Sequence, residues 1–422
     1  MLPGMSRGIY SLLMYLLIPL FIWRLIRRGF KSSEYWERWG ERFGYGNLAR
    51  QPQSVWVHAV SVGEVQAAAP LIEHLLRNKE LPVVVTTMTP TGSSRVRALF
   101  GGRVRHVYAP YDLPDAVHRF LSRVNPVKAI IMETEIWPNM ITWCYKRNIP
   151  VILANARLSE RSARGYRRIP RLGKLALRRI HTIATQSYAD SERFVTLGAE
   201  RAQLQMTGSI KLDVEIPASL REQGQVIRRQ LGVERAVWVA ASTHAGEEEQ
   251  VLEAYAVVRQ TIPDCLLVLV PRHPERADEV EQLCRRRGYQ VLRRSQSKPL
   301  DMPQDIYLLD TLGELTQFFA ACDVAFIGGS LVPVGGHNMV EASALGVAVI
   351  FGPHLFNFQE ISGQLLQADA ARIVHDSDAL AGSVIELLGD ANLRHQLGEN
   401  GQRFIQANRG ALKRLITIIE SC

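Results

Sequence analysis

Short runs of apolar residues recur along this chain and alternate with longer stretches in which apolar residues have helical spacing. Near-continuous apolar runs are typical of strands buried on both faces of a parallel sheet. In the first half of the chain the runs are residues 55–60, 82–86, 128–132 and 150–154. In the second half they are residues 237–241, 265–270, 306–309, 323–328 and 347–351. Repeated strand–helix units of this kind predict an α/β fold with two parallel-sheet domains and right-handed crossovers.

The pattern changes in the middle of the chain. Between residues 208 and 217 the strand-like pattern gives way to acidic residues and a proline. We therefore expect one α/β domain over residues 31–212 and a second over residues 213–422, preceded by a separate segment at residues 1–30. In such proteins ligands bind preferentially in the cleft between the domains.

The N-terminal segment has a pattern of its own. Residues 9–26 are apolar apart from Ser11 and Arg24. A helix of this length spans about 27 Å, just short of the roughly 30 Å of a bilayer core. No small-residue cleavage site follows, so we expect an anchor helix that stays on the protein. The alternative is a helix that lies in the membrane interface or packs on the body of the protein.

Charge refines this picture. Basic residues at the C-terminal end of the apolar segment and just after it outnumber Arg7 before it, and they are Arg24, Arg27, Arg28 and Lys31. The positive-inside rule then places the body of the protein in the cytoplasm.

The formal net charge of +9 indicates anionic partners such as nucleic acid, acidic lipid or phosphorylated substrates. The 5 cysteines include no C-x-x-C pair, which supports neither a disulfide framework nor a cysteine zinc site.

A glycine-rich turn follows the predicted strand at residues 323–328. Glycines let the backbone approach an anion, and we expect a helix to begin near Asn338 and present free N–H groups to it. Glu341 follows within that helix, where it can accept hydrogen bonds from ribose hydroxyls. The turn is not G-x-G-x-x-G, so a dinucleotide is not the first expectation. The alternative is a packed strand–turn–helix unit in which Asn338 is only an N-cap.

The first strand leads directly into Ser61-Val-Gly-Glu64 and a helix. In one interpretation Glu64 is a general base, because a helix N-terminus favours the ionised form of a carboxylate. In the other, S-x-x-E is a capping box. The residues alone leave both interpretations open.

Two further carboxylates end the predicted strand at residues 128–132. If the strand extends far enough, its period of two puts Glu133 and Glu135 on one face, which suggests a functional site; the alternative is a solvated turn.

Lys211 lies near the expected domain crossing. A lone lysine is usually a surface residue, and its position toward the cleft is the only reason from the residues to single it out.

Arginines are concentrated in one stretch of the first domain. Arg157, Arg161, Arg164, Arg168 and Arg171 recur at steps of four and three, which places them on one helical face. Pro170 predicts two helices or a kinked one. A solvated face is the usual explanation of a charge run, but so one-sided a set favours binding of anionic lipid or phosphate.

Several common catalytic motifs are absent from the sequence, namely H-E-x-x-H, a P-loop and G-x-S-x-G. Asp376-Ser-Asp378 has the D-x-D shape of metal-dependent glycosyltransferases, but it precedes a helical run and is expected to be an N-cap. We therefore expect no metal site and no cofactor.

Taken in order, these segments resemble one family over essentially the whole chain. Its marks in the first half are Ser61–Glu64, residues 86–92, Met132–Glu135, Asn155–Leu158, Thr207–Ser209 and Lys211. In the second half they are Ser242–His244, Pro271–Arg276, Gly328–Leu331, Gly335–Asn338 and Gly352–His354. The set is similar to the Kdo transferases (3-deoxy-D-manno-octulosonic acid transferases) of Gram-negative lipopolysaccharide synthesis.

The resemblance implies a GT-B fold and metal-independent transfer of Kdo from CMP-Kdo to a lipid A precursor, lipid IVA, with inversion. It makes Glu64 the base rather than only a cap, and it makes Glu133 and Lys211 stabilisers of the transition state. The CMP contacts that it implies are Pro271, Arg272, Leu312, Gly313, Glu314, Asn338, Met339, Val340 and Glu341.

The implied partners are CMP-Kdo, the lipid A precursor and the cytoplasmic face of the inner membrane, with no nucleic acid. Arg157, Arg161 and Arg164 would hold phosphates of the acceptor or of lipid. Two alternatives stay open on the sequence. Another GT-B sugar-nucleotide enzyme, such as an epimerase, would need neither the anchor nor the arginine face. A membrane-bound protein that binds anionic lipid would need the arginine face but not Glu64 or Gly335–Asn338.

Overall fold

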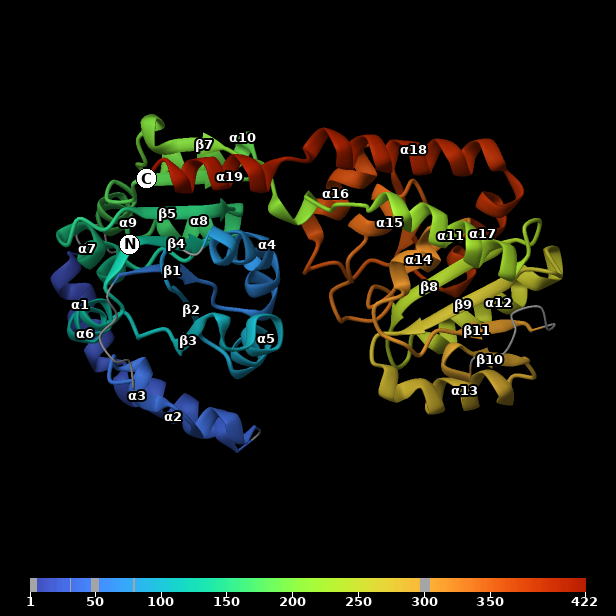
Figure 1. Ribbon diagram of the computed structural model, residues 1–422, viewed down its shortest axis with the longest axis horizontal. Helices are drawn as coiled ribbons and strands as arrows, with labels where there is room; N and C mark the ends of the chain where they lie inside the picture. The colour runs from blue at the N-terminus through green and yellow to red at the C-terminus, as the bar shows by residue number, and fades with distance from the viewer. Residues whose placement is uncertain (1–5, 31, 47–52, 79, 297–303) are drawn as a thin grey trace. The chain divides into compact units, whose positions relative to one another are not determined.

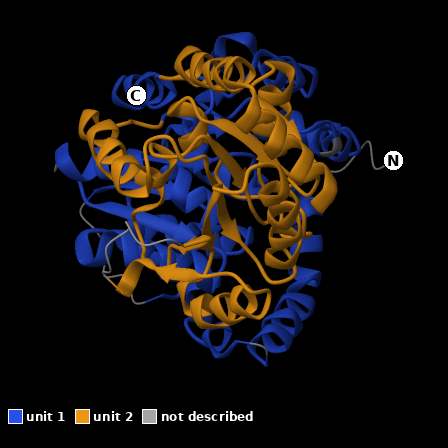
Figure 2. Ribbon diagram, turned by 90° about the vertical axis from the view of Figure 1, so that its right-hand side faces the viewer, with its two compact units in different colours: residues 1–213, 410–422 blue, residues 214–409 orange. Residues whose placement is uncertain are grey.

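The computed structural model describes residues 6–30, 32–46, 53–78, 80–296 and 304–422, and the side chain of Arg161 also lies outside the described part. The chain divides into two compact units, shown in Figure 2. Unit 1 comprises residues 1–213 and 410–422, and unit 2 comprises residues 214–409.

Unit 1 contains a fully parallel sheet with the strand order β3-β2-β1-β4-β5-β6-β7 (Figure 1). Its strands are β1 (Ser54–His58), β2 (Val83–Thr87), β3 (Arg105–Tyr108), β4 (Pro126–Met132), β5 (Val151–Ala156), β6 (Thr182–Thr185) and β7 (Leu204–Met206). Its α-helices are α1 (Arg7–Leu16), α2 (Ile18–Gly29), α3 (Trp39–Arg42), α4 (Val62–Asn78), α5 (Pro90–Phe100), α6 (Pro114–Val124), α7 (Pro138–Lys146), α8 (Glu160–Tyr166), α9 (Pro170–Leu177), α10 (Tyr188–Thr196) and α19 (Ala411–Glu420). Short 3-10 turns are η1 (Ser33–Trp36), η2 (Gly101–Arg103), η3 (Arg201–Gln203) and η4 (Ile210–Leu212).

The two faces of this sheet have separate cores. Successive side chains of a strand point to opposite faces, and in β1 Trp56 lies in one core while Val55 and Val57 lie in the other. Helices α6, α7, α9 and α10 cover the Trp56 face, and α4, α5 and α19 cover the opposite face. Burial on both faces is the reason that the central strands read as continuous apolar runs.

Unit 2 repeats this plan with the strand order β10-β11-β9-β8-β12-β13-β14, again fully parallel. Its strands are β8 (Val237–Thr243), β9 (Leu266–Pro271), β10 (Val291–Arg293), β11 (Ile306–Leu308), β12 (Val324–Ile327), β13 (Ala348–Phe351) and β14 (Ala371–Ile373). Its helices are α11 (Ala218–Leu231), α12 (Glu248–Thr261), α13 (Ala277–Arg286), α14 (Leu315–Phe319), α15 (Val340–Ala344), α16 (Gln359–Gln367), α17 (Ser377–Gly389) and α18 (Ala391–Asn408), with the 3-10 turns η5 (Pro274–Arg276) and η6 (Arg294–Gln296). The prediction of two parallel-sheet α/β domains is confirmed.

Each sheet has one point where the strand order reverses. In unit 1 the chain adds β2 and β3 on one side of β1 and then returns to place β4 on the other. In unit 2 it adds β9 on one side of β8 and later places β12 on the other. Ligands of open α/β sheets bind outside the carboxyl ends of the strands at such a switch point. The loops that follow β1, β4, β8 and β12 are therefore where a site is expected.

Every predicted apolar run overlaps a strand, whereas five short strands were not predicted: β3, β6, β7, β10 and β14. Most of them lie at or next to a sheet edge, where one side is not paired and residues such as Arg293 and Arg372 interrupt the apolar pattern. These strands form because they pair with neighbouring strands, and their own residues do not show a clear strand pattern.

The second domain does not extend to the C-terminus as expected. The boundary falls after Asp213, one residue beyond the predicted position, but residues 410–422 return to unit 1. Asp213 accepts hydrogen bonds from the backbone N–H groups of Gly410 and Leu412 at the start of α19. The apolar face of α19, with Leu415 and Ile419, then completes a core of unit 1.

The N-terminal apolar segment forms two helices rather than one. α1 ends at Leu16 and α2 begins at Ile18, with Pro19, which has no backbone N–H to donate, in the first turn of α2. Within the described residues no single helix is long and apolar enough to cross a membrane, and only α1 and α2 together meet that criterion, as a pair bent by 45°. The expected continuous helix over residues 9–26 is therefore wrong.

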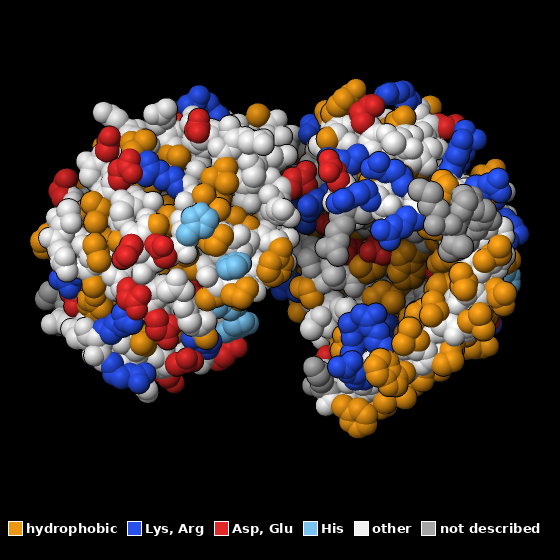
Figure 3. Space-filling model, turned by 180° about the vertical axis from the view of Figure 1, so that it is seen from behind, with side chains coloured by type: hydrophobic (Ala, Val, Ile, Leu, Met, Phe, Trp, Pro, Cys, Tyr) orange, Lys and Arg blue, Asp and Glu red, His pale blue; other side chains and the backbone are white. Residues whose placement is uncertain are grey.

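The α1–α2 pair is fastened to the body of unit 1 by polar contacts. The Tyr10 hydroxyl donates to Asp112 Oδ2 at 3.0 Å, and the Tyr15 hydroxyl donates to Asp115 Oδ1 at 2.6 Å. Apolar side chains on the pair stay exposed, and they are Leu12, Leu16, Leu20 and Trp23. Figure 3 shows the resulting apolar band along the edge of unit 1 at the lower right.

Candidate functional site

Glu64 lies in the first turn of α4, the helix that follows β1 at the switch point of unit 1. Its side chain is 7% exposed. The backbone N–H of Val60 donates to Oε2 and the hydroxyl of Ser61 donates to Oε1, both at 2.9 Å. The backbone N–H of Glu64 donates in turn to Ser61 Oγ at 3.3 Å. The capping interactions are therefore present, and they hold the carboxylate in one orientation.

Burial raises the pKa of Glu64 from 4.5 to about 8, and the nearby charges of Glu133 and Glu135 add to that rise. The expectation that the helix N-terminus would dominate and favour ionisation is wrong, because loss of hydration outweighs the hydrogen bonds that Glu64 accepts. A carboxylate with a pKa close to the working pH is a stronger proton acceptor than an ordinary one.

Glu133 does not continue the strand before it. β4 ends at Met132, so the argument from strand period fails, and Glu133 has a left-handed backbone with φ of +55°. Such a backbone is uncommon for a residue other than glycine, and strained residues of this kind cluster at functional sites. The turn nevertheless keeps Glu133 and Glu135 close enough to Glu64 for their charges to act on its pKa.

Lys211 and Glu133 form an ion pair in unit 1. Lys211 Nζ lies 2.8 Å from Glu133 Oε1, and both side chains are about one-quarter exposed. Lys211 belongs to η4, whose first residue, Ile210, donates its backbone N–H to Asn155 Oδ1 at 3.1 Å. The structure thus brings together Lys211 and Glu133, which the sequence separates widely.

Asn155 was not singled out individually from the sequence. It is the last residue but one of β5, with a left-handed φ of +53° and a fully buried side chain, and the structure gives its Nδ2 no hydrogen-bond partner among the described residues. A buried amide without a partner is costly and calls for an explanation. Asn155 holds the turn that carries Lys211, so we interpret it as a positioning residue.

The residues expected to contact CMP all lie in unit 2, at the end of β9 or in the segments that follow β9, β11 and β12. Pro271 ends β9 and is buried, whereas Arg272 directly after it is exposed. Leu312, Gly313 and Glu314 lie between β11 and α14; Leu312 is exposed, and Glu314 pairs with Arg294 at 2.7 Å. The ion pair with Arg294 holds the pKa of Glu314 below its ordinary value.

The helix expected to begin near Asn338 is shorter than predicted. α15 begins at Val340 and has 5 residues, and Met339 before it is fully buried. Asn338 Oδ1 accepts the backbone N–H of Val340 at 3.1 Å, but the N-cap position of α15 is Met339, so the alternative that Asn338 is the N-cap is also wrong. So short a helix has a weak dipole, and the argument that its N-terminus binds the phosphate does not hold.

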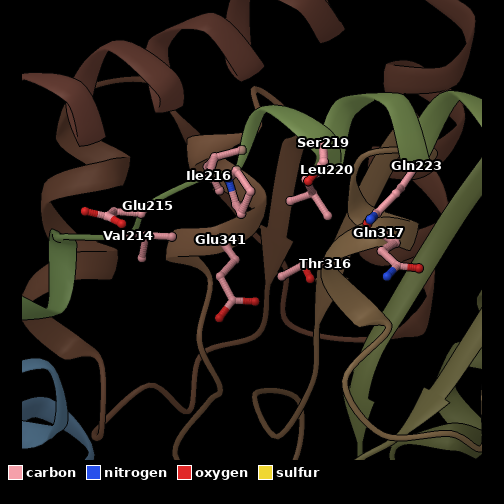
Figure 4. Close-up of a pocket in the computed structure, with 10 residues that line it drawn as sticks. Val214, Glu215, Ile216, Ser219, Leu220, Gln223, Thr316, Gln317 and Glu341 are labelled. Atoms are coloured by element: carbon pink, nitrogen blue, oxygen red, sulfur yellow. The ribbon is translucent and has the colours of Figure 1, made fainter. Parts of the chain in front are cut away.

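Glu341 lines a pocket of about 350 Å³ within unit 2. Figure 4 shows the Glu341 side chain extending from α15, with its carboxylate pointing away from Leu220 of α11 and with Thr316 of α14 to its side. Asn338 Nδ2 donates to Glu341 Oε1 at 3.0 Å, and burial raises the pKa of this carboxyl. Glu341 therefore presents an oriented hydrogen-bond acceptor to a polar pocket.

Over the arginine-rich stretch the chain forms α8 and α9, which are separated before Pro170 as the proline predicted. Arg157 precedes α8 and Arg168 lies between the two helices, so the expectation that the five arginines share one helical face is wrong. Arg164, Arg168 and Arg171 are exposed, whereas Arg157 is half-buried. Figure 3 shows basic side chains gathered around a hollow in the face of unit 1, on the right.

In the D-x-D sequence, Asp376 Oδ1 accepts the backbone N–H of Ala379 at 2.8 Å, which confirms the expected N-cap.

Comparison with known proteins adds sequence relationships to this geometry. A family model described as 3-deoxy-D-manno-octulosonic-acid transferase (kdotransferase) matches residues 37–214. The 3-deoxy-D-manno-octulosonic acid transferase of Haemophilus influenzae is 40% identical over 420 residues, covering 99% of this chain and 98% of that protein. The protein of the same name from Bordetella pertussis is 35% identical, with 99% of each chain covered.

Solved structures add a likeness in fold. A UDP-GlcNAc 2-epimerase from Neisseria meningitidis superposes with a TM-score of 0.55 over 88% of this chain and 100% of its own, at 12% identity. An identity this low shows a shared fold and does not favour the epimerase alternative.

Proposed function

Because this chain belongs to the 3-deoxy-D-manno-octulosonic acid transferase family and is a glycosyltransferase of lipopolysaccharide biosynthesis, we propose that it moves Kdo from CMP-Kdo to the lipid A precursor lipid IVA, with inversion at the anomeric carbon. The acceptor hydroxyl attacks the anomeric carbon from the side opposite the phosphate. A single displacement of this kind needs one base for the acceptor and stabilisation of the departing phosphate.

Glu64 is the proposed base. It removes the proton from the acceptor hydroxyl as the new bond forms, and its burial supports this role because a poorly solvated carboxylate gains more from accepting a proton. Glu133 and Lys211 would hold the acceptor and stabilise charge in the transition state. Their ion pair supports this role, because each fixes the position of the other.

Unit 2 is proposed to bind the donor. Arg272 would contact the phosphate, and Glu341 would accept hydrogen bonds from the ribose hydroxyls. No metal ion is required in this proposal, because a monophosphate leaving group can be neutralised by protein cations and N–H groups alone.

The α1–α2 pair is proposed to hold the protein at the cytoplasmic face of the inner membrane. Its exposed apolar side chains and its basic C-terminal turn, with Arg27 and Arg28, suit a helix pair that lies in the interface rather than one that crosses the bilayer. The exposed arginines of α8 and α9 would bind phosphates of the acceptor or of neighbouring lipid.

The observation that carries this proposal is a buried glutamate at the switch point of unit 1 whose pKa is raised beside the Glu133 carboxylate. The test is incubation of the purified protein with CMP-Kdo and a tetraacylated lipid A precursor, followed by mass spectrometry of the product. Wild type should add Kdo, and Glu64→Gln should fold normally but lose about a hundred- to ten-thousand-fold in rate. Glu73→Gln, a change on the same helix at a half-buried residue that pairs with Arg103, should retain full activity. Normal turnover by Glu64→Gln would leave that residue with its capping role only.

A further inference from the structure

Three histidines follow three neighbouring strands at the centre of the unit 2 sheet. His244 directly follows β8, His273 follows β9, and His337 lies in the loop after β12. Because β9, β8 and β12 are adjacent and parallel, these loops meet at one edge of the sheet. β8 and β12 flank the switch point, where ligands of such sheets bind.

His244 and His337 form a close pair. Their Nε2 atoms lie 2.7 Å apart, and their rings are nearly parallel, with centroids 5.0 Å apart and planes 8° apart. The His273 ring meets that of His244 edge to face, with centroids 5.8 Å apart. Two nitrogens at this distance share one proton, so one ring donates and the other accepts.

The surrounding loops are built to hold this pair. Gly329 has a left-handed φ of +66°, and a Cβ there would lie 2.9 Å from the His337 ring. The buried Glu247 carboxylate accepts backbone N–H groups from Gly329, Ser330 and Leu331 at 2.7, 3.0 and 2.9 Å, and from His244 at 3.3 Å. The Glu247 carboxylate therefore accepts hydrogen bonds from both loops that carry the histidine pair, the one after β8 and the one after β12.

The charges that act on the pair are positive. Arg272 and His273 affect both rings and Arg276 affects His244, while Glu247 is occupied by backbone N–H groups and Glu248 by Arg276 at 2.7 Å. Burial is the largest cause that lowers the pKa of His337 to about 4 and lowers that of His244, and the nearby arginine charges add to it. Without a ligand the pair is therefore neutral near pH 7, and an anion placed beside it would favour its protonation.

We propose that His244 and His337 bind the phosphate of the cytidine nucleotide and take up a proton as it binds, so that an imidazolium faces the leaving group. This inference rests on the proposed function and adds two residues to the donor site. In the reaction the bond between the anomeric carbon and the phosphate oxygen breaks, and its electron pair stays on that oxygen. The anomeric carbon bonds to the acceptor oxygen, whose proton passes to Glu64.

The phosphate changes from one negative charge in the diester to two in free CMP. An imidazolium beside it interacts more strongly with the second state, so it stabilises the transition state more than the bound donor. The proton either stays on the pair or moves to the phosphate oxygen, and it leaves when CMP is released.

The test is isothermal titration calorimetry of CMP into the full-length protein at pH 7.5, in two buffers with different ionisation enthalpies. At this pH the phosphate of free CMP is mostly dianionic, since its second pKa is about 6. Wild type should take up protons on binding. His244→Gln and His337→Gln should abolish the uptake and weaken CMP binding about tenfold or more, because a charged hydrogen bond is lost.

Two controls separate this effect from misfolding. His395→Gln, an exposed change on α18, should bind CMP with the uptake of wild type. Cytidine, which has no phosphate, should bind wild type and both pair variants equally. CMP binding by wild type without proton uptake, or uptake that survives in both pair variants, would overturn the inference.

The transfer assay is independent of these measurements. Proton uptake without Kdo transfer would refute the proposed function but not the phosphate site. Transfer without proton uptake would refute the proton-sharing pair alone.

Discussion

The raised pKa of Glu64 predicts the pH dependence of catalysis. A general base acts only when it is ionised, so the rate should rise with pH through the pKa of Glu64, which burial places at about 8. The expected direction is thus an alkaline rise in activity rather than the acidic rise of an ordinary glutamate.

The size of the effect follows from the fraction of ionised carboxylate. With a pKa of about 8, roughly one-tenth of Glu64 is ionised at pH 7 and roughly nine-tenths at pH 9. The value of kcat/KM should therefore increase about tenfold between these two pH values. With an ordinary pKa near 4.3 it would be flat over the same range.

The assay is the initial rate of CMP release from limiting CMP-Kdo between pH 6 and 9.5, because kcat/KM reports groups of the free enzyme. Substrate phosphates also titrate, so a matched variant is needed. Glu135 raises the pKa of Glu64 by its charge, and its carboxylate accepts a hydrogen bond from Trp137 at 2.7 Å. Glu135→Gln keeps that acceptor and removes the charge, so it should shift the rise to lower pH while substrate ionisation stays the same.

Two results would refute the reasoning. A profile that is flat from pH 6 to 9 would show that Glu64 is already ionised or is not the base. A rise with the same midpoint in wild type and Glu135→Gln would assign it to the substrate or to another group.

Four further outcomes are expected. Glu341→Gln should weaken CMP binding about tenfold or more in calorimetry, since a charged acceptor is lost, while the acceptor KM stays unchanged. Arg164→Ala with Arg168→Ala should raise the acceptor KM and reduce flotation with anionic vesicles at equal CMP affinity; lower CMP affinity would indicate misfolding instead. Leu16→Ser with Trp23→Ser should reduce binding even to neutral vesicles, and unchanged flotation would refute the interfacial helix pair. Activity should persist in excess EDTA, and loss restored by magnesium would contradict the metal-free proposal.

Much of the fold could be predicted from the sequence because the central strands are buried on both faces. Such strands must be apolar along their whole length, so the runs at residues 128–132 and 265–270 could be read directly. The edge strands β10 and β14 could not, because half of their surroundings is solvent or loop.

The return of the C-terminus to unit 1 could not be predicted for a different reason. It depends on contacts of Asp213 and on the fit of α19 against a core formed by residues far away in the sequence. No local pattern encodes either.

The candidate site, like the fold, could be predicted from the sequence only in part. Motifs at the ends of strands could be placed at the sheet edge from the sequence, which is how Glu64 and Glu133 were found. The direction of the Glu64 pKa shift could not be predicted, because it depends on burial and on charges from another loop. Likewise, His244 and His337 belong to motifs that were noted separately, but only the order of β8 and β12 shows that their rings meet.

The central claim is that Glu64 activates the acceptor for one direct displacement at the anomeric carbon. The measurement that tests it most directly is the configuration of the Kdo linkage in the product relative to the donor, determined by NMR of the purified glycolipid. The account predicts inversion, because the acceptor oxygen enters opposite the departing phosphate. Retention would contradict it, because two successive displacements and a covalent glycosyl-enzyme intermediate would then be required.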